Sequence, residues 1–218
     1  MSQLPFNLPV RAALGRQDFM SDASNAAALA LVDAWPDWPH FGAILVGPPG
    51  SGKSHLASIW SQRSDARALA SVLEGNAWLA EDCHAGIDER ALFHALNQAR
   101  QLGGHVLMTA QSYPAHWKIA LPDLASRLKA SPVTGIGAPG DGLLRSVLVK
   151  LFADRQIAVD ESTVSFMLLR MPRSLGAARE LVADIDKQAM AERADVTRAF
   201  VARVMSRRAE PGFFDGGE

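Results

Sequence analysis

The chain has 218 residues, of which 48% are hydrophobic and 21% charged, a composition that suits a globular protein with one domain and a smaller appended unit. With 22 Lys and Arg residues against 23 Asp and Glu residues, the net charge is −1, so no global positive field drives the protein onto nucleic acid. The single cysteine, Cys83, excludes an internal disulfide and fits a reducing cytoplasm, and the longest apolar run, residues 26–32, is far shorter than the ~18 residues of a membrane helix.

The chain opens with an apolar peptide, MSQLPFNLPV, that has two prolines and no charged side chain. It lacks the basic start and the continuous apolar core of a signal peptide, so we expect it to be retained. Pro5 and Pro9 disfavour a helix and favour an extended backbone. Residues 1–10 are therefore predicted to be an extended segment that either folds back onto the domain or docks on a partner.

Residues 11–138 are predicted to form an α/β core, because short apolar runs alternate with helical patterns. Helices are expected at 23–35, at 54–63 and after Asp88, where Gly103 and Gly104 would end the helix. Strands that alternate with helices form a parallel sheet covered on both faces. The expected strands are residues 43–46, 66–70, 77–80, 105–109 and 132–136.

A run of glycines and prolines at 135–142 marks a change of composition, after which the pattern is helical. Asp160 and Asp195 are the expected caps of two of these helices. We expect residues 139–206 to form a small α-helical lid and residues 207–218 to be a tail. The lid helices are predicted at 141–155, 160–171, 173–192 and 196–206, and the third has an apolar stripe of Leu175, Ala178, Leu181, Val182, Ile185 and Ala189.

The strongest signal is the segment GPPGSGKS at residues 47–54, which matches G-x-x-x-x-G-K-[ST] between a predicted strand and a predicted helix. Its glycines let backbone N–H groups point at phosphate oxygens, while Lys53 adds a charge and the Ser54 hydroxyl can ligate Mg²⁺. The segment therefore predicts binding of ADP or ATP with Mg²⁺. The predicted nucleotide-binding residues here are Gly47, Pro48, Pro49, Gly50, Ser51, Gly52, Lys53, Ser54 and His55.

A phosphate loop of this kind works with an acidic group at the end of a neighbouring strand. Glu81 and Asp82 follow the expected strand at 77–80 and are the candidates for catalysis, with Glu81 and Ser54 as the candidates for holding the metal. The alternative is an acidic strand end that only caps the next loop. Because the usual first acid is Asp and Glu81 is one methylene longer, we expect weak or no intrinsic ATPase activity.

Several segments occur in the order and spacing of the AAA+ domain of the bacterial replication initiator DnaA: FMSDASN at 19–25, GPPGSGKSHL, LAED, LMTAQSYP and LASRL. Over roughly residues 3–205 the chain resembles this family, and within it the shorter regulatory homologues of the Hda type. The resemblance implies a P-loop AAA+ core, a parallel sheet covered by helices on both faces, with a small C-terminal α-helical lid.

The resemblance also implies further nucleotide contacts. Phe19 and Asn25 would border the adenine, although Phe19 is equally well explained as core. Thr109 and Gln111 resemble sensor I near the γ-phosphate, with Gln111 in place of an acid that is common in initiators. Arg173 resembles the sensor II arginine, which would tie the lid to the bound nucleotide.

Arg127, in the segment DLASRL at 123–128, resembles the arginine finger of box VII. Such an arginine stabilises charge on a neighbour's γ-phosphate and can raise the rate of hydrolysis by ~10³ or more. Without the resemblance, a lone arginine on a short amphipathic helix would be interpreted as a surface ion-pair partner. The resemblance thus predicts that Arg127 acts on the nucleotide of another protein.

Gln3, Leu4, Phe6 and Leu8 resemble the clamp-binding hexapeptide of Hda-type regulators, in which an amide and three apolar side chains fill a groove on the DNA sliding clamp. The implied function is a cytoplasmic regulator of replication initiation that, bound to the clamp, stimulates ATP hydrolysis by the initiator DnaA. Little or no direct DNA binding is expected, because no helix-turn-helix follows the lid. A homo-oligomer is compatible with this function.

A second hypothesis, from a different class, is a self-sufficient AAA+ ATPase that acts as a helper or loader in DNA replication or transposition. It would use the same phosphate loop and lid. Glu81 and Asp82 would then be directly catalytic, and a basic DNA-binding surface should be present. A net charge near zero argues mildly against this hypothesis.

Overall fold

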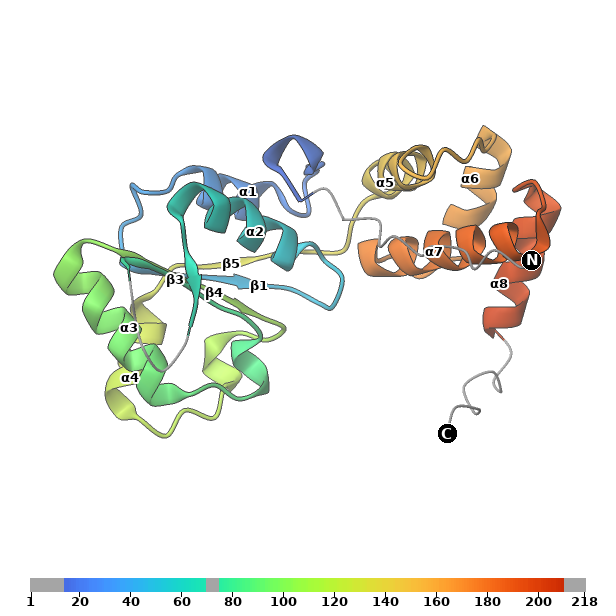
Figure 1. Ribbon diagram of the computed structural model, residues 1–218. Coiled ribbons are helices and arrows are strands. Elements are labelled where there is room, and N and C mark those ends of the chain that lie inside the picture. The colour runs from blue at the N-terminus through green and yellow to red at the C-terminus, as the bar shows by residue number, and fades with distance from the viewer. Residues whose placement is uncertain (1–13, 70–74, 210–218) are drawn as a thin grey trace, which may run out of the picture.

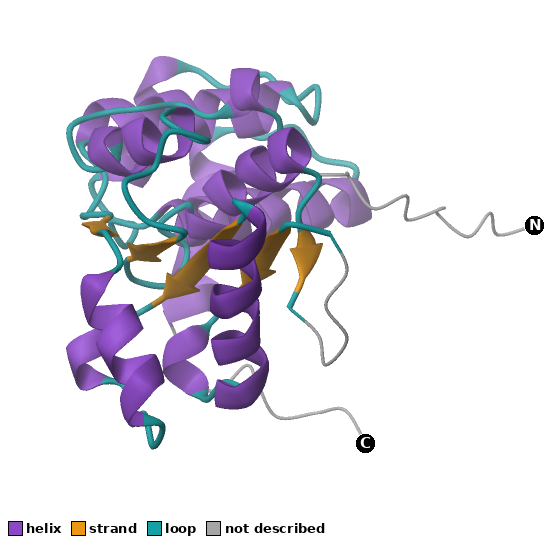
Figure 2. Cartoon of the chain, turned by 90° about the vertical axis from the view of Figure 1, so that its left-hand side faces the viewer, coloured by secondary structure: helices purple, strands orange, loops and turns teal. Residues whose placement is uncertain are grey.

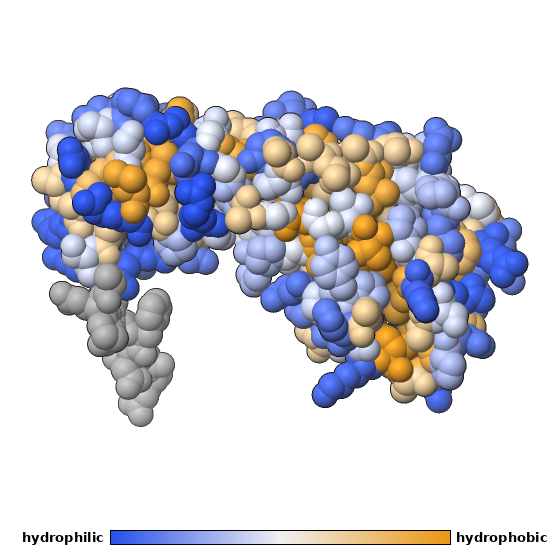
Figure 3. All heavy atoms as spheres, turned by 180° about the vertical axis from the view of Figure 1, so that it is seen from behind, coloured by the Kyte–Doolittle hydropathy of each residue, from blue (hydrophilic) through white to orange (hydrophobic). Residues whose placement is uncertain are grey.

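The computed structural model describes residues 14–69 and 75–209, and these form two bodies that are joined by the segment after the last strand (Figure 1). One body is a five-stranded sheet with helices around it, and the other is the group of helices that follows. Seen from behind, the two bodies meet along their upper part and are separated below (Figure 3). The predicted clamp-binding residues Gln3, Leu4, Phe6 and Leu8 lie outside the described residues.

All neighbouring strands of the sheet are parallel, in the order β2-β3-β4-β1-β5. Because parallel strands end at the same edge, the segments that follow β1, β3 and β4 are brought together there. The five strands lie within the predicted ranges to one or two residues, except that β2 is shorter than expected. They are β1 (Gly42–Val46), β2 (Arg67–Ala68), β3 (Ala77–Ala80), β4 (His105–Ala110) and β5 (Val133–Gly135).

Helices lie on both faces of the sheet (Figure 2). Along β1, Ala43 and Leu45 face α1 (Ala26–Asp33) and α2 (Lys53–Ser64), while Ile44 and Val46 face the opposite side. That opposite side is covered by α3 (Glu89–Leu102) and α4 (Pro122–Ala130). All five residues of β1 are buried, as expected of a strand covered on both faces.

The ends of α3 follow the expected capping signals. The Asp88 side chain accepts a hydrogen bond from the Ala91 N–H group at 2.9 Å, and Gly103 ends the helix with a φ of +66°. By contrast, α1 begins at Ala26 rather than at residue 23. The reason is that Asn25 is used in a preceding turn, where its Oδ1 accepts from the Asp22 N–H group and its Nδ2 donates to the Met20 carbonyl.

The second body consists of α5 (Asp141–Ala153), α6 (Glu161–Leu168), α7 (Leu175–Glu192) and α8 (Arg198–Ala209), which share one apolar cluster. Every residue of the predicted apolar stripe on α7 is buried in this cluster. Asp160 caps α6 as predicted, but the prediction for Asp195 was wrong. The hydroxyl of Thr197 accepts the hydrogen bond from the Phe200 N–H group instead, and α8 extends three residues past its expected end.

None of the helices in the described part of the chain is both long and apolar enough to cross a bilayer. The two bodies also contact each other at defined points. The Asp22 carboxylate accepts a hydrogen bond from the Gly140 N–H group at 2.9 Å, and Lys150 of α5 forms an ion pair with Asp18 at 3.1 Å. These contacts join the helical body to the segment that precedes α1.

Candidate nucleotide-binding site

The segment Gly47–Gly52 forms the turn between β1 and α2, as the motif predicted. Gly50 and Gly52 have φ angles of +69° and +104°, a region that side chains with a Cβ atom avoid. A Cβ atom on Gly50 would also lie 2.6 Å from the Cα atom of Gly176 at the start of α7. The loop therefore depends on glycine for both its own conformation and the approach of the lid.

Lys53, the first residue of α2, lies within this turn with only 7% of its surface exposed. Its Nζ donates hydrogen bonds to the carbonyl oxygens of Gly47 at 2.7 Å and Pro48 at 2.9 Å. Burial lowers the pKa of the ammonium group, and the negative charge of Asp82 opposes this shift. The buried hydroxyl of Ser51 has no hydrogen-bond partner among the described residues, so the turn also has an unsatisfied polar atom.

These features fit a bound phosphate. Glycine backbone, a buried ammonium group and the N-terminus of α2 converge on one turn, and the Ser51 hydroxyl is free to donate. Ser54, the predicted metal ligand, is exposed on the first turn of α2. The described residues contain no group of three or more His, Cys, Asp or Glu side chains that could hold a metal ion by themselves, so Mg²⁺ would depend on phosphate oxygens for part of its coordination.

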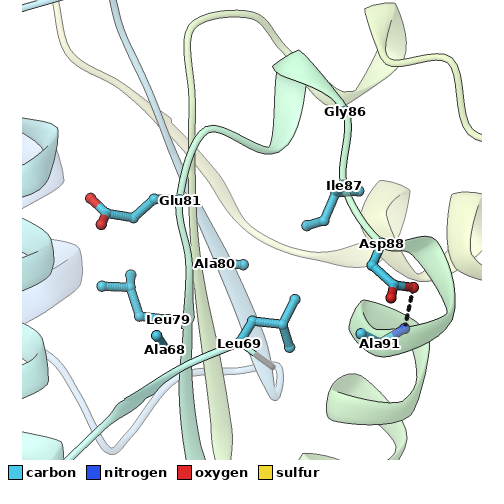
Figure 4. Close-up of a pocket in the computed structure, with 9 residues that line it drawn as sticks. All are labelled: Ala68, Leu69, Leu79, Ala80, Glu81, Gly86, Ile87, Asp88 and Ala91. Atoms are coloured by element: carbon cyan, nitrogen blue, oxygen red, sulfur yellow. Dashed lines mark hydrogen bonds between the residues drawn. The ribbon is translucent and has the colours of Figure 1, made fainter. Parts of the chain in front are cut away.

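The two acidic residues after β3 have different surroundings. Asp82, with a φ of +52°, acts electrostatically on Lys53, and its backbone N–H group donates to the Thr109 hydroxyl at 3.2 Å. Glu81 instead borders a cavity of about 430 Å³ beside the edge of the sheet, with Ile87 and Asp88 on its far side (Figure 4). The geometry thus favours Asp82 over Glu81 as the acid next to the phosphate loop.

The two sensor I candidates also differ. Thr109 is buried in β4, and its hydroxyl accepts the hydrogen bond from Asp82 described above. Gln111 lies one residue beyond β4 and is exposed at the edge of the sheet where the phosphate loop begins. Thr109 therefore orients the backbone of Asp82, whereas the Gln111 side chain is accessible to a ligand.

A cavity of about 380 Å³ lies between the sheet body and the lid, next to the phosphate loop. On the sheet side it is lined by Phe19, Gly52 and His55, and the Phe19 and His55 rings meet edge to face with centroids 5.1 Å apart. The Nε2 atom of His55 lies 3.1 Å from the Gly15 carbonyl, and burial lowers the pKa of its imidazole. The cavity wall is thus an aromatic surface with a neutral histidine, which suits a nucleobase.

The Phe19 ring packs in the core and also borders this cavity, and its contact with adenine stays a prediction. Asn25 does not line the cavity. It is buried, and its side-chain amide forms hydrogen bonds with the backbone of Asp22 and Met20 in the turn before α1. We therefore infer a structural role for Asn25 in shaping the segment that carries Phe19.

On the lid side, Arg173, which was predicted to contact the nucleotide, does not line the cavity, whereas Arg179, which was not predicted, does. Arg173 precedes α7, is more than half exposed and forms an ion pair with Asp141 at 2.6 Å. Arg179, one turn after Leu175, lines the cavity, where burial lowers the pKa of its guanidinium. The available signal was the spacing of four residues from buried Leu175, which places both side chains on neighbouring parts of one helix face.

In the folded chain, Arg127 lies far from the phosphate loop. It is on the last turn of α4, where its guanidinium carbon is 5.0 Å from the centroid of the Phe93 ring and 6.0 Å from that of Phe41. Phe41 immediately precedes β1, whereas the phosphate loop immediately follows it. The guanidinium is therefore near the amino ends of the strands, whereas the phosphate loop lies at their carboxyl ends.

No protein-family model matches the sequence, and a search of curated proteins finds no match. Among solved structures, domain III of the Thermotoga maritima replication initiation protein DnaA superposes with a TM-score of 0.76 at 14% identity, over 94% of this chain and 100% of that one. AMPPCP-bound DnaA from Aquifex aeolicus gives 0.68 at 13% identity, over 88% and 68%.

The Thermotoga maritima RuvB Holliday junction branch migration motor gives a TM-score of 0.67 at 16% identity, over 88% of this chain and 71% of that one. At such identities the likeness concerns the fold. The predicted fold class is confirmed: the chain has the fold of these DnaA and RuvB domains, a parallel sheet covered by helices and followed by a small group of helices.

Proposed function

We propose that the protein is a nucleotide-dependent regulator of replication initiation of the Hda type, acting in the cytoplasm. It binds ADP or ATP with Mg²⁺ at the phosphate loop and attaches to the DNA sliding clamp through Gln3, Leu4, Phe6 and Leu8. From there it presents Arg127 to ATP bound by the initiator DnaA and stimulates its hydrolysis. In this proposal residues 1–10 are the clamp-binding peptide, 11–138 the core, 139–206 the lid and 207–218 the tail.

The observation that carries the proposal is the separation of Arg127 from the chain's own phosphate loop. The five residues of β1 lie between Phe41, which contacts Arg127, and the loop, and a strand of that length spans about 16 Å. A side chain near the amino ends of the strands cannot reach a phosphate at their carboxyl ends. Arg127 is therefore suited to act on a nucleotide held by a second protein.

Within the chain's own site, each residue has a distinct task. The backbone of Gly47–Gly52 and the Lys53 ammonium bind the phosphates, while Phe19 and His55 contact the base. Asp82, whose backbone is held by Thr109, is the acid that acts electrostatically on Lys53, and Arg179 adds a positive charge from the lid. Mg²⁺, when bound, would neutralise phosphate charge, with Ser54 as its protein ligand and Glu81 as the predicted but less well placed acid.

The test is the rate of ATP hydrolysis by the initiator in the presence of DNA-loaded clamp and this protein. We expect Arg127→Ala to reduce the stimulation by about 10³-fold, because an arginine finger supplies that much of the rate. Lys129→Ala, an exposed cation two residues further along, is the matched control and should retain full stimulation. An Arg127→Ala variant as active as the natural protein would reject the proposal.

One observation favours the alternative, a self-sufficient ATPase. Asp82 acts on Lys53, so an acid does accompany the phosphate loop. Rapid steady-state hydrolysis by the isolated protein, abolished by Asp82→Ala, would support that function. Under our proposal the isolated protein hydrolyses ATP slowly. The Asp82→Ala variant should then stimulate ATP hydrolysis by the initiator nearly as well as the natural protein does.

A further inference from the structure

The guanidinium of Arg127 sits against two aromatic rings that belong to different elements. Phe93 is on α3, and Phe41 precedes β1; both are partly buried against the apolar cluster under α3 and α4. The backbone at this point is also held, because the N–H group and the hydroxyl of Ser131 both donate to the Arg127 carbonyl at 3.0 Å. The backbone carbonyl and the guanidinium group of Arg127 are thus both held in place.

The positive charge of Arg127 is not neutralised by the residues around it. Within the described part of the chain Arg127 takes part in no ion pair, although Asp123 lies four residues earlier on α4. Most other arginines with an assigned contact on the lid, such as Arg155, Arg173 and Arg208, are paired with carboxylates. Arg170 and Arg198 also lie over a ring, that of Phe166. Arg127 instead contacts two rings, one on α3 and one in the segment before β1, and is not paired with a carboxylate of the described residues.

Aromatic rings and carboxylates hold a guanidinium in different ways. A carboxylate occupies the N–H donors and cancels the charge, whereas a ring attracts the cation through its face and leaves the N–H groups at the edge free to bind an oxyanion. A ring also has little rotational freedom once it is packed, so it keeps the guanidinium in a narrow range of positions. This combination is what a cation needs in order to bind a phosphate oxygen with little reorganisation.

We propose that Phe93 and Phe41 are positioning residues for Arg127, which hold its guanidinium in place for the partner's phosphate while preserving its charge and its donors. This inference rests on the proposed role of Arg127. Phe93 is expected to contribute more than Phe41, because its ring is closer to the guanidinium.

His40 provides a readout of the arginine's position that needs no partner protein. Its ring lies 3.9 Å from that of Phe41, centroid to centroid, and its Nδ1 accepts from the Gly42 N–H group and lies near the Ser131 hydroxyl. Burial and the positive charge of Arg127 both lower the pKa of His40, while the Gly42 carbonyl opposes the shift. If Arg127 moves away, the pKa of His40 must rise.

The first experiment follows the His40 ring by NMR through a pH titration. We expect Arg127→Gln to raise the pKa of His40, and Phe93→Leu to raise it by a similar amount because the released guanidinium moves into solvent. Phe93→Tyr keeps an aromatic face and should leave the pKa of His40 unchanged. A rise in Arg127→Gln without one in Phe93→Leu, or no rise in either variant, would overturn the inference.

The second experiment measures initiator ATP hydrolysis as a function of the concentration of this protein. Phe93→Leu should lower the rate at saturation about fivefold, the change expected from losing one cation–π contact, and Phe93→Tyr should restore it. A Phe93→Leu defect that disappears at saturation would mean that Phe93 contributes to docking rather than to positioning, and would overturn the inference. If Arg127→Ala itself has no effect, the proposed function fails with it; if only Phe93→Leu has none, the inference fails alone.

Discussion

At the residue scale, Arg173 and Arg179 have different electrostatic surroundings although six positions separate them. Asp141 neutralises Arg173 at the lid surface, while no described residue forms an ion pair with Arg179 beside the cavity. A partly desolvated guanidinium next to a cavity gains most from an anionic or polar ligand, because it has lost water without gaining a partner. Arg179 is therefore the better candidate for sensing nucleotide from the lid.

We predict that Arg179→Ala weakens ADP binding about tenfold, in line with the loss of one hydrogen bond to a charged group. Arg173→Ala, the matched control on the same segment, should change the affinity by less than about twofold, since its partner is Asp141. Isothermal titration calorimetry measures both. The reverse order of effects would restore Arg173 as the sensor.

Cys83 is a second case in which burial decides chemistry. It is almost fully buried below β3, its thiol donates to the Ala80 carbonyl, and desolvation raises its pKa to about 12. Only the thiolate reacts with disulfide reagents, so the native protein should not be labelled at pH 8. Labelling followed by absorbance should begin only when urea unfolds the chain, and rapid labelling of the native protein would show that the site is open.

At the element scale, a backbone hydrogen bond joins the N-terminus of α7 to the phosphate loop. The Gly176 N–H group donates to the Gly50 carbonyl at 3.1 Å, and Ser174 caps the helix by accepting from Gly176 and Ala177. A Cβ atom on Gly176 would lie 3.0 Å from the Cα atom of Gly50, and that neighbour is rigid backbone. The lid thus rests on the phosphate loop, so we expect its position to be coupled to nucleotide binding.

We predict that Gly176→Ala pushes α7 away from the loop and weakens ADP binding about fivefold, the equivalent of about 1 kcal/mol of overpacking. Gly142→Ala is the matched control, because a Cβ atom there would meet no neighbour within 4 Å. That variant should bind ADP normally and be at least as stable in urea unfolding, because alanine is a better helix former than glycine. Equal ADP affinities in the two variants would show that the contact is not coupled to the site.

The sequence predicted elements well where the pattern is local, as with the buried stripe of α7 and the Asp88 cap of α3. The prediction from sequence failed where two nearby residues were equally good candidates for the same role. Asp195 and Thr197 are both good capping residues two positions apart, and in the structure Thr197 is the one that caps α8, which packs against α6 and α7. The start of α1 likewise depends on Asn25 and Asp22, whose hydrogen bonds join the turn to Gly140 across the molecule.

At the scale of the whole molecule, the candidate site is divided between two bodies. The sheet supplies the phosphate loop, Phe19 and His55, and the lid supplies Arg179 and Lys150, with the Lys150 to Asp18 ion pair crossing the boundary. The site residues on the sheet are predictable from the sequence because they lie within a contiguous motif or match a known one. The site residues on the lid are not predictable, because their position depends on how the lid packs against the sheet, which no local pattern encodes.

The central claim is that a nucleotide is held between these two bodies by the phosphate loop, and urea unfolding with and without Mg-ADP tests it most directly. At a ligand concentration about 100 times the dissociation constant, binding to the folded state alone adds about 2.7 kcal/mol to the free energy of unfolding. We predict this gain for the natural protein and none for Lys53→Ala. An unfolding midpoint of the natural protein that does not change at millimolar Mg-ADP would contradict the account.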